Sequence, residues 1–172
     1  GRLVPVKGHA VLLEAFRILS QSYPNVLLIL VGDGPLRVQL EADANRMGLG
    51  RSVIFAGHQE QAYDFINMVD VFVLPSLHEG IPMVLLEALA LQRPVVASRV
   101  GGIPEVITHD RSGKLVCAGD ARELALTLYQ LIERPDKAGA LGVEGRKQVE
   151  HEFGAHTMAG KTADLYQSWC EI

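Results

Sequence analysis

The chain has 172 residues, of which 48% are hydrophobic and 21% charged, values typical of a single globular domain. Its formal net charge is −4 with no run of basic residues, which argues against a nucleic-acid partner, and no apolar run reaches the roughly 18 residues that a membrane-spanning helix requires. Cys117 and Cys170 have neither metal-ligand spacing nor a disulfide pattern, so we expect free thiols in a reducing compartment and a cytoplasmic protein.

Strands and helices are predicted to alternate through the first two thirds of the chain. Short, β-branched apolar runs indicate strands, and apolar residues spaced three or four apart indicate helices. The predicted strands are a stub at 1–4, then 26–31, 53–56, 71–74, 94–98 and 114–117, and the predicted helices are 9–22, 36–47, 59–68 and 82–91. This alternation predicts an α/β fold, a doubly wound, parallel, Rossmann-like sheet of about six strands. The unbroken apolar run 26–31 is typical of a strand buried on both faces.

After residue 120 only helices are predicted. They span 121–133, with Asp120 as the N-cap, 135–151 and 155–169. The last one has more apolar residues than one narrow stripe requires, including Met158, Ala159, Leu165, Tyr166 and Trp169. The C-terminal third therefore adds helices, not strands, to the fold.

The segment 75–105 holds the residues that predict a binding site. Its loop carries Glu79, and Pro82 then opens a helix in which Glu87 is the only charged residue. A helix that is apolar all round is expected to be buried, and a buried carboxylate is costly unless it is paired. Two interpretations follow. Either Glu87 caps a neighbouring backbone group while Glu79 is a solvated loop residue, or both carboxylates hold a ligand.

The first turn of this helix is the reason for considering a ligand. Its free N–H groups, near Met83 and Val84, and the positive end of the helix dipole attract anions. Glu87 shares a face with this turn because it lies four residues after Met83, and Glu79 lies just before the turn. Two carboxylates around a phosphate-attracting helix end suit a ligand with hydroxyls at both ends and phosphate in the middle, such as a nucleotide-sugar.

Two other patterns carry less information. Gly32-Asp33-Gly34 follows a strand and precedes a helix, like a dinucleotide fingerprint, but Arg37 stands where the third glycine belongs. We interpret it as a strand-exit turn at the edge of the ligand crevice. Arg2 and Lys7, judged from their local sequence alone, are surface cations.

The sequence also predicts the surroundings of a few single residues. Gly101 and Gly102 are expected to permit a close backbone approach. His9 is expected to be solvated. No pair of histidines has metal-ligand spacing with a third ligand, so no metal site is predicted.

Taken together, these residues resemble a known family. Glu79 and Glu87 stand within EGIPMVLLEALA, followed by RPVVAS and GGIPEVI, and the combination is similar to the donor-binding half of a retaining glycosyltransferase of family 4, with the GT-B architecture. The resemblance runs from Gly1 to about Leu165 and departs at 81–82, where many members have Phe-Gly. It implies that residues 1–172 are a C-terminal, nucleotide-sugar-binding domain, one half of a GT-B fold, whose N-terminal acceptor-binding domain is absent.

The resemblance also implies a role for each motif residue. Arg2 and Lys7, in the pattern GRL…KG, would grip the diphosphate of the donor and Glu79 would hold sugar hydroxyls, which makes these three the catalytic candidates. Glu87 would hold the ribose hydroxyls. The other donor-binding candidates are Gly57, His58, Gly80, Ile81, Pro82, Met83 and Val84. No Asp-x-Asp pair is present to hold a metal, so two cations and a helix N-terminus would stabilise the leaving diphosphate without any cofactor.

Two hypotheses about function follow. In the first, the whole protein is a glycosyltransferase of the hexosyltransferase type and the isolated domain is inactive. In the second, the domain is a catalytically inactive nucleotide-binding module of the same fold. The expected partners are the nucleotide-sugar and the missing N-terminal domain, and a peripheral membrane association is considered only through that missing half. The last helix, which in GT-B proteins commonly crosses to the other domain, is expected to be partly exposed, frayed or buried in a crystal or dimer contact.

Overall fold

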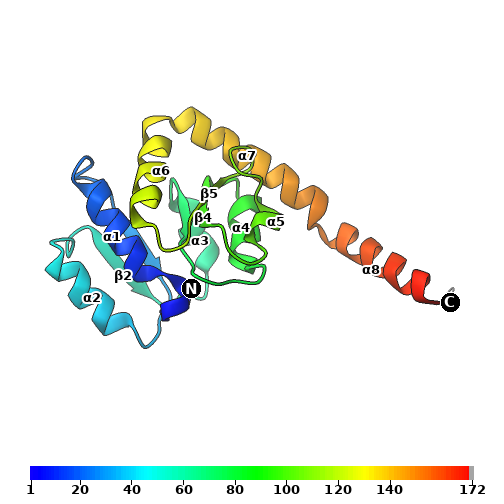
Figure 1. The fold of residues 1–172 in the computed structure, drawn as a ribbon, viewed down its shortest axis with the longest axis horizontal. Coiled ribbons are helices and arrows are strands. Elements are labelled where there is room, and N and C mark those ends of the chain that lie inside the picture. The colour runs from blue at the N-terminus through cyan, green and yellow to red at the C-terminus, as the bar shows by residue number, and fades with distance from the viewer. Residues whose placement is uncertain (171–172) are drawn as a thin grey trace.

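The computed structural model describes residues 1–170 as an α/β body followed by C-terminal helices (Figure 1). Five strands run parallel in two hydrogen-bonded groups. In the first group β1 (Leu28–Val31) pairs with β2 (Val53–Gly57), with Leu30 opposite Phe55. In the second, β4 (Val95–Ser98) pairs with both β3 (Phe72–Leu74) and β5 (Lys114–Val116), with Val96 opposite Val73 and Lys114.

Helices connect and follow these strands, as the predicted alternation requires. They are the 3-10 turn η1 (Pro5–Lys7), α1 (His9–Ser20), α2 (Arg37–Arg46), α3 (Ala62–Met68), α4 (Met83–Ala90), α5 (Ile103–Val106), α6 (Ala121–Glu133), α7 (Pro135–Glu152) and α8 (Ala155–Cys170). α6 has the predicted bounds and the predicted cap, because the Asp120 carboxylate accepts a hydrogen bond from Glu123 N at 2.8 Å. The predicted fold class, a parallel α/β sheet with C-terminal helices, is confirmed.

The three-stranded group is covered by helices on both faces. Successive side chains of a strand point to opposite faces, and β4 follows this rule. Val96 packs in a cluster with Leu124 of α6, whereas Val95 and Ala97 pack in a second cluster with Leu85 of α4. All four residues of β4 are buried, as expected at the centre of a doubly wound sheet.

The two-stranded group is covered less completely. Leu30 is buried in the cluster that includes α1 and α2, but Ile29 is half-buried and Ile54 of β2 is 45% exposed. The prediction that 26–31 is buried on both faces is therefore wrong. An unbroken apolar run permits such burial, but the helices packed nearby decide it.

The predicted N-terminal strand stub forms no ladder. Leu3 N donates to Asp33 O, in the loop after β1, at 2.9 Å, and Val6 O accepts from Leu77 N, in the loop after β3, at 2.7 Å. The two contacts are not parts of a continued ladder because the chain turns into η1 between them. The described strands therefore number five, not about six, and the segment 1–8 lies between the two strand groups, near the N label in Figure 1.

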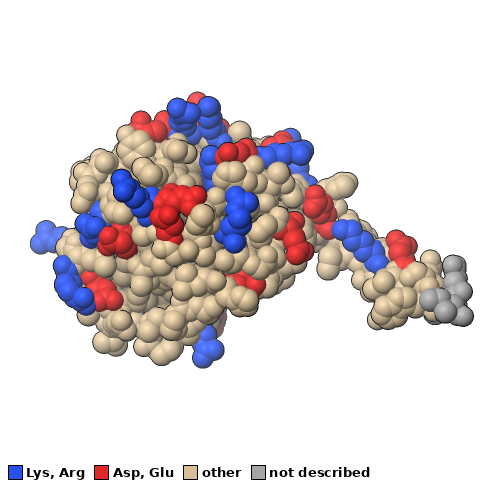
Figure 2. Space-filling model, viewed as in Figure 1, with Lys and Arg blue, Asp and Glu red and all other residues tan. Residues whose placement is uncertain are grey.

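α8 projects from the body as an arm (Figure 1). Every residue from 158 to 169 is exposed, with Tyr166 63% and Trp169 64% exposed, in agreement with the expectation for the last helix. Within residues 1–170, no helix is long and apolar enough to cross a bilayer. Acidic and basic side chains are interspersed over the face of the body seen in Figure 2.

Candidate functional site

The loops after β1 and β3 contact segment 1–8 at the carboxyl edge of the strands, and the loop after β4 packs on the loop after β3. Gly8 has a φ of 69° and packs so closely on the chain after β3 that a Cβ there would lie 2.0 Å from Pro75 O. Gly34 packs in the same way on Leu3, where a Cβ would lie 2.5 Å from the Leu3 oxygen. In open α/β sheets ligands bind at this edge, and the candidate residues all belong to these segments, to α4 or to the end of β2.

Glu79 is bound by two side chains at this edge. Lys7 Nζ lies 2.5 Å from Glu79 Oε1, and the Ser76 hydroxyl donates to the same oxygen at 2.7 Å. The Glu79 side chain is 9% exposed, and a carboxylate so deeply buried requires such partners. The interpretation of Glu79 as a solvated loop residue is therefore wrong. The structure instead brings together Lys7 and Glu79, which the sequence analysis assigned to different parts of a ligand.

Backbone contacts from the loop after β4 hold the chain around Glu79. Gly102 N donates to Gly80 O at 3.0 Å. Gly101 has a φ of 52°, and a Cβ there would lie 1.8 Å from Glu79 O. The close backbone approach expected of these two glycines is present, and the segment that approaches them is the Glu79 loop, residues 75–82 between β3 and α4.

α4 presents an open N-terminus to the same edge. It begins one residue later than predicted, because Pro82 is extended, with a ψ of 122°, and serves as the N-cap. No side chain caps the helix, and the first N–H groups of an α-helix have no intrahelical acceptor. The N–H groups of Met83 and Val84 are therefore the donors that this end offers to an anion.

Glu87 lies one turn further along α4 and is half-buried. Leu85 and Leu89 are buried, whereas Met83 is 66% exposed, so α4 is not buried all round as predicted; its first turn reaches the open edge. Among residues 1–170, the Glu87 carboxylate makes no hydrogen bond or ion pair. The alternative in which Glu87 caps a neighbouring backbone group is therefore not observed.

The other candidates lie at the edge without joining this cluster. Arg2 and His58 are exposed. Gly57 ends β2 with a φ of 71°, and its oxygen accepts from Gly32 N at 2.7 Å. Ile81, in the Glu79 loop, is 44% exposed.

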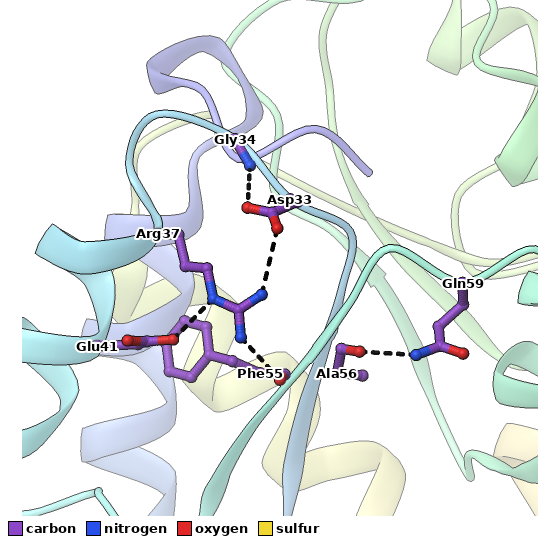
Figure 3. A network of polar contacts seen from close by, with 7 residues as sticks. All are labelled: Asp33, Gly34, Arg37, Glu41, Phe55, Ala56 and Gln59. Atoms are coloured by element: carbon purple, nitrogen blue, oxygen red, sulfur yellow. Dashed lines mark hydrogen bonds and ion pairs between the residues drawn. The ribbon is translucent and has the colours of Figure 1, made fainter.

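Arg37 holds the loop after β1 in place (Figure 3). Its guanidinium donates to Glu41 Oε1 at 2.9 Å, to Asp33 Oδ2 at 3.3 Å and to Phe55 O at 3.5 Å. Asp33 also accepts from Gly34 N at 2.7 Å. These bonds tie the loop to β2, as expected of a strand-exit turn.

Sequence reasoning missed two residues near the candidate site. Ser76 is fully buried and lies two residues after β3 and three before Glu79, but no local pattern marks it as part of a site. His9, expected to be solvated, is half-buried, and its Nδ1 is buried without a partner. Burial, with smaller effects from the N-terminal ammonium and Lys7, lowers the pKa of His9 to about 4.

No group of three or more His, Cys, Asp or Glu side chains within residues 1–170 is placed to hold a metal ion. A depression of about 830 Å³ lies between α6, α7 and the loop before β5 and is lined by none of the candidate residues. The candidate site is therefore an open edge of the sheet, formed by segment 1–8, the Glu79 loop and α4.

Comparisons with known proteins identify the family and agree with the fold. Residues 1–148 match the family described as glycosyl transferases group 1. The amylovoran biosynthesis glycosyltransferase AmsK of Erwinia amylovora is 36% identical over 174 aligned residues, which cover 96% of this chain and 43% of AmsK. The GDP-mannose-dependent alpha-(1-6)-phosphatidylinositol monomannoside mannosyltransferase of Mycolicibacterium smegmatis is 32% identical over 173, covering 95% of this chain and 45% of the relative.

A crystal structure gives the same result. Alr3699/HepE of Anabaena, in complex with UDP, superposes with a TM-score of 0.90 and 29% identity over 98% of this chain and 47% of HepE. The chain thus spans less than half the length of each of these proteins. The fold is the predicted half of a GT-B architecture, and the chain belongs to the glycosyl transferases group 1 family.

Proposed function

We propose that this chain is the nucleotide-sugar-binding domain of a retaining glycosyltransferase. One observation carries the proposal: along the chain, the open N-terminus of α4 lies between the paired carboxylate of Glu79 and the carboxylate of Glu87, which has no partner within residues 1–170. A nucleoside diphosphate sugar has hydroxyls at both ends and two phosphates between them. Its groups match the order of hydrogen-bond acceptor, anion site and hydrogen-bond acceptor that Glu79, the N-terminus of α4 and Glu87 form along the chain.

The diphosphate would bind to cations and amides. Arg2 and Lys7 would contact its oxygens, together with the N–H groups of Met83 and Val84 at the positive end of α4. The two amides are fixed by the helix before the reaction, and together with the cations they would face the charge that develops on the leaving group and stabilise it.

The hydroxyls at the two ends would bind to the carboxylates. Glu79 would accept from the sugar and Glu87 from the ribose. The remaining candidates would shape the two ends, with Gly57 and His58 near the nucleobase and the backbone of 80–82 near the sugar ring.

In the transfer itself, the acceptor oxygen would attack the anomeric carbon on the face from which the diphosphate leaves. The carbon–oxygen bond to the diphosphate breaks, and the acceptor proton passes to a leaving phosphate oxygen, so the configuration is retained. This route needs no metal and no second carboxylate as base. The acceptor would bind to a second domain, in keeping with relatives more than twice as long as this chain.

The comparisons support the donor class. The HepE structures are described as complexes with UDP and with UDP-glucose, and the Mycolicibacterium relative is named as GDP-mannose-dependent. We therefore propose a nucleotide-linked hexose as donor. We also propose a cytoplasmic location, supported by the exposed free thiol of Cys117.

Calorimetry on the 172-residue chain tests the proposal. The ligands are UDP, GDP, ADP and dTDP and a hexose conjugate of each, with the matching nucleoside monophosphates as controls. We expect saturable binding of at least one diphosphate and its conjugate, binding of the monophosphate about tenfold weaker because it lacks the second charged group, and no transfer to added acceptors. Absence of binding to every member of the panel would contradict the proposed function.

A further inference from the structure

Within residues 1–170, hydrogen bonds reach only one of the two carboxylate oxygens of Glu79. Lys7 Nζ and the Ser76 hydroxyl both bind Oε1, at 2.5 and 2.7 Å. Among residues 1–170 Oε2 receives no hydrogen bond. The carboxylate is thus anchored through Oε1 and has Oε2 free to accept from a ligand.

The two partners of Oε1 differ in mobility. The Lys7 side chain is 28% exposed, and its ammonium sits at the end of four rotatable carbons. Ser76 is 0% exposed, and its hydroxyl is one bond from Cβ. The backbone on both sides of Ser76 is held, because Gly8 packs against Pro75 and Leu77 N donates to Val6 O. Ser76 is therefore the rigid partner and Lys7 the adaptable one.

A bound diphosphate would compete with Glu79 for Lys7. The diphosphate carries more negative charge than one carboxylate, so the ammonium is expected to shift toward it when the donor binds. If Lys7 were the only partner, the carboxylate would then be left buried and unpaired, a costly state from which the side chain would rotate away. A second donor on Oε1 removes this cost.

We propose that Ser76 is a positioning residue for the donor sugar: it keeps Oε2 of Glu79 directed at the sugar after Lys7 has moved to the diphosphate. The proposal rests on the function proposed above. Ser76 acts through Glu79 and touches neither the sugar nor the phosphates. Its contribution therefore appears in the recognition of sugar hydroxyls, which are hydrogen-bond donors to Oε2, and not in the recognition of the nucleotide.

The test compares two ligands in one protein. Calorimetry on the 172-residue chain measures Kd for the best-binding nucleoside diphosphate of the panel and for its hexose conjugate. Ser76→Ala should weaken binding of the conjugate about tenfold, because a hydrogen bond to a charged acceptor is lost, while Kd for the diphosphate changes less than about twofold. A merely structural serine would weaken both ligands equally.

Ser112→Ala is the matched control. Ser112 is also buried, at 1% exposure, and its hydroxyl accepts from Thr108 N at 2.9 Å, but it precedes β5 at the opposite edge of the sheet. This variant should leave the ratio of the two dissociation constants unchanged.

A double-mutant cycle shows whether Ser76 acts through Glu79. Glu79→Gln keeps the shape of the side chain, and in this background Ser76→Ala should change the ratio less than about threefold. An unchanged ratio in Ser76→Ala alone, or an undiminished change in the Glu79→Gln background, would overturn the role of Ser76 and leave the proposed function standing. Absence of binding by the unmodified chain would overturn both.

Discussion

At the scale of single residues, the two carboxylates of the site have opposite surroundings. Glu79 is 9% exposed and accepts from two donors. Glu87 is half-buried and has no polar partner within the described chain. An unpaired carboxylate in such a position costs stability, so we propose that a ligand supplies the partner that Glu87 lacks in the empty domain.

Two substitutions of Glu87 separate binding from stability. Glu87→Gln and Glu87→Leu should both weaken nucleotide binding about tenfold or more, because each removes a charged acceptor. Glu87→Leu should leave the free energy of unfolding unchanged or raise it, since an apolar residue replaces an unpaired charge. Calorimetry and urea unfolding measure the two quantities, with Glu150→Gln, an exposed residue of α7, as a control for affinity. Unaltered nucleotide affinity in both variants would assign Glu87 a structural role.

His9 should make the stability of the domain depend on pH. Its pKa is lowered to about 4, mainly by burial, against about 6.5 in an unfolded chain. The unfolded chain therefore binds more protons between these values, so the contribution is complete above about pH 6.5 and is lost as the pH falls toward 4. We expect this contribution to the free energy of unfolding to be about 1–2 kcal/mol, allowing for the partial exposure of the ring.

The measurement is urea unfolding of the unmodified chain and of His9→Asn from pH 7 to pH 4.5. As the pH falls, the free energy of unfolding of the unmodified chain should decrease relative to that of His9→Asn. Parallel pH profiles would show that the histidine titrates alike in the folded and unfolded states.

At the scale of elements, local sequence signals predict the bounds of helices well, but they do not predict contacts between distant segments. α6 has its predicted bounds because the Asp120 cap, the apolar stripe and Pro135 after its end all agree. The stub at 1–4 is wrong because a strand needs a neighbour to pair with along its length, and here the chain turns at Pro5. Local patterns contain no information about such neighbours.

The site shows the same division. The sequence places Glu79 and Glu87 on a loop and a helix, and the structure agrees. The sequence could not reveal Ser76. The role of that hydroxyl depends on a contact of Lys7, which lies 72 residues from Glu79, with the same carboxylate oxygen. The roles of these residues toward a ligand remain predictions.

The loop after β4 offers a test of how the Glu79 loop is held. Gly101 and Gly119 both have positive φ, 52° and 82°, so Ala is strained at either. A Cβ at Gly101 would lie 1.8 Å from Glu79 O, whereas one at Gly119 meets no atom within 4 Å. Gly119→Ala should therefore cost about 1–2 kcal/mol, and Gly101→Ala more, with displacement of the Glu79 loop.

Of the two substitutions, only Gly101→Ala should alter the candidate site, because only it displaces the Glu79 loop. Gly101→Ala should weaken binding of the nucleotide-sugar by more than about tenfold, because the carboxylate moves with its backbone, while Gly119→Ala should leave it unchanged. Calorimetry and thermal unfolding of both variants provide the comparison. Equal affinities would mean that the loop after β4 does not set the position of Glu79.

At the scale of the whole molecule, the body and α8 are distinct in packing. The body contains two buried clusters, whereas the outer turns of α8 are exposed throughout (Figure 1). Exposed apolar residues on such an arm mark an interaction site. Since the chain spans less than half the length of its relatives, we propose that the rest of the protein covers this helix.

Hydrogen exchange and truncation test the independence of α8. Amides 163–169 should exchange rapidly, because an isolated helix of this length is marginal in water, whereas those of β4, buried on both faces, should be protected. Removing residues 155–172 should change the free energy of unfolding by less than about 0.5 kcal/mol. Strong protection from residue 163 onward in a monomeric sample would place the helix in the core of this domain.

Because the proposed site needs Lys7 and Glu79 in contact, binding of the donor would depend on completed folding. The two residues are separated by 72 positions, a span that includes α1, α2, α3 and three of the strands. In the proposed site, a partly folded chain in which this loop is open would bind no donor, so the donor would stabilise only the native state. At a hundred times Kd this linkage adds about 2.7 kcal/mol, enough to lower the unfolded population about a hundredfold. The supply of the donor would then set how long the protein survives proteolysis, apart from how fast it reacts.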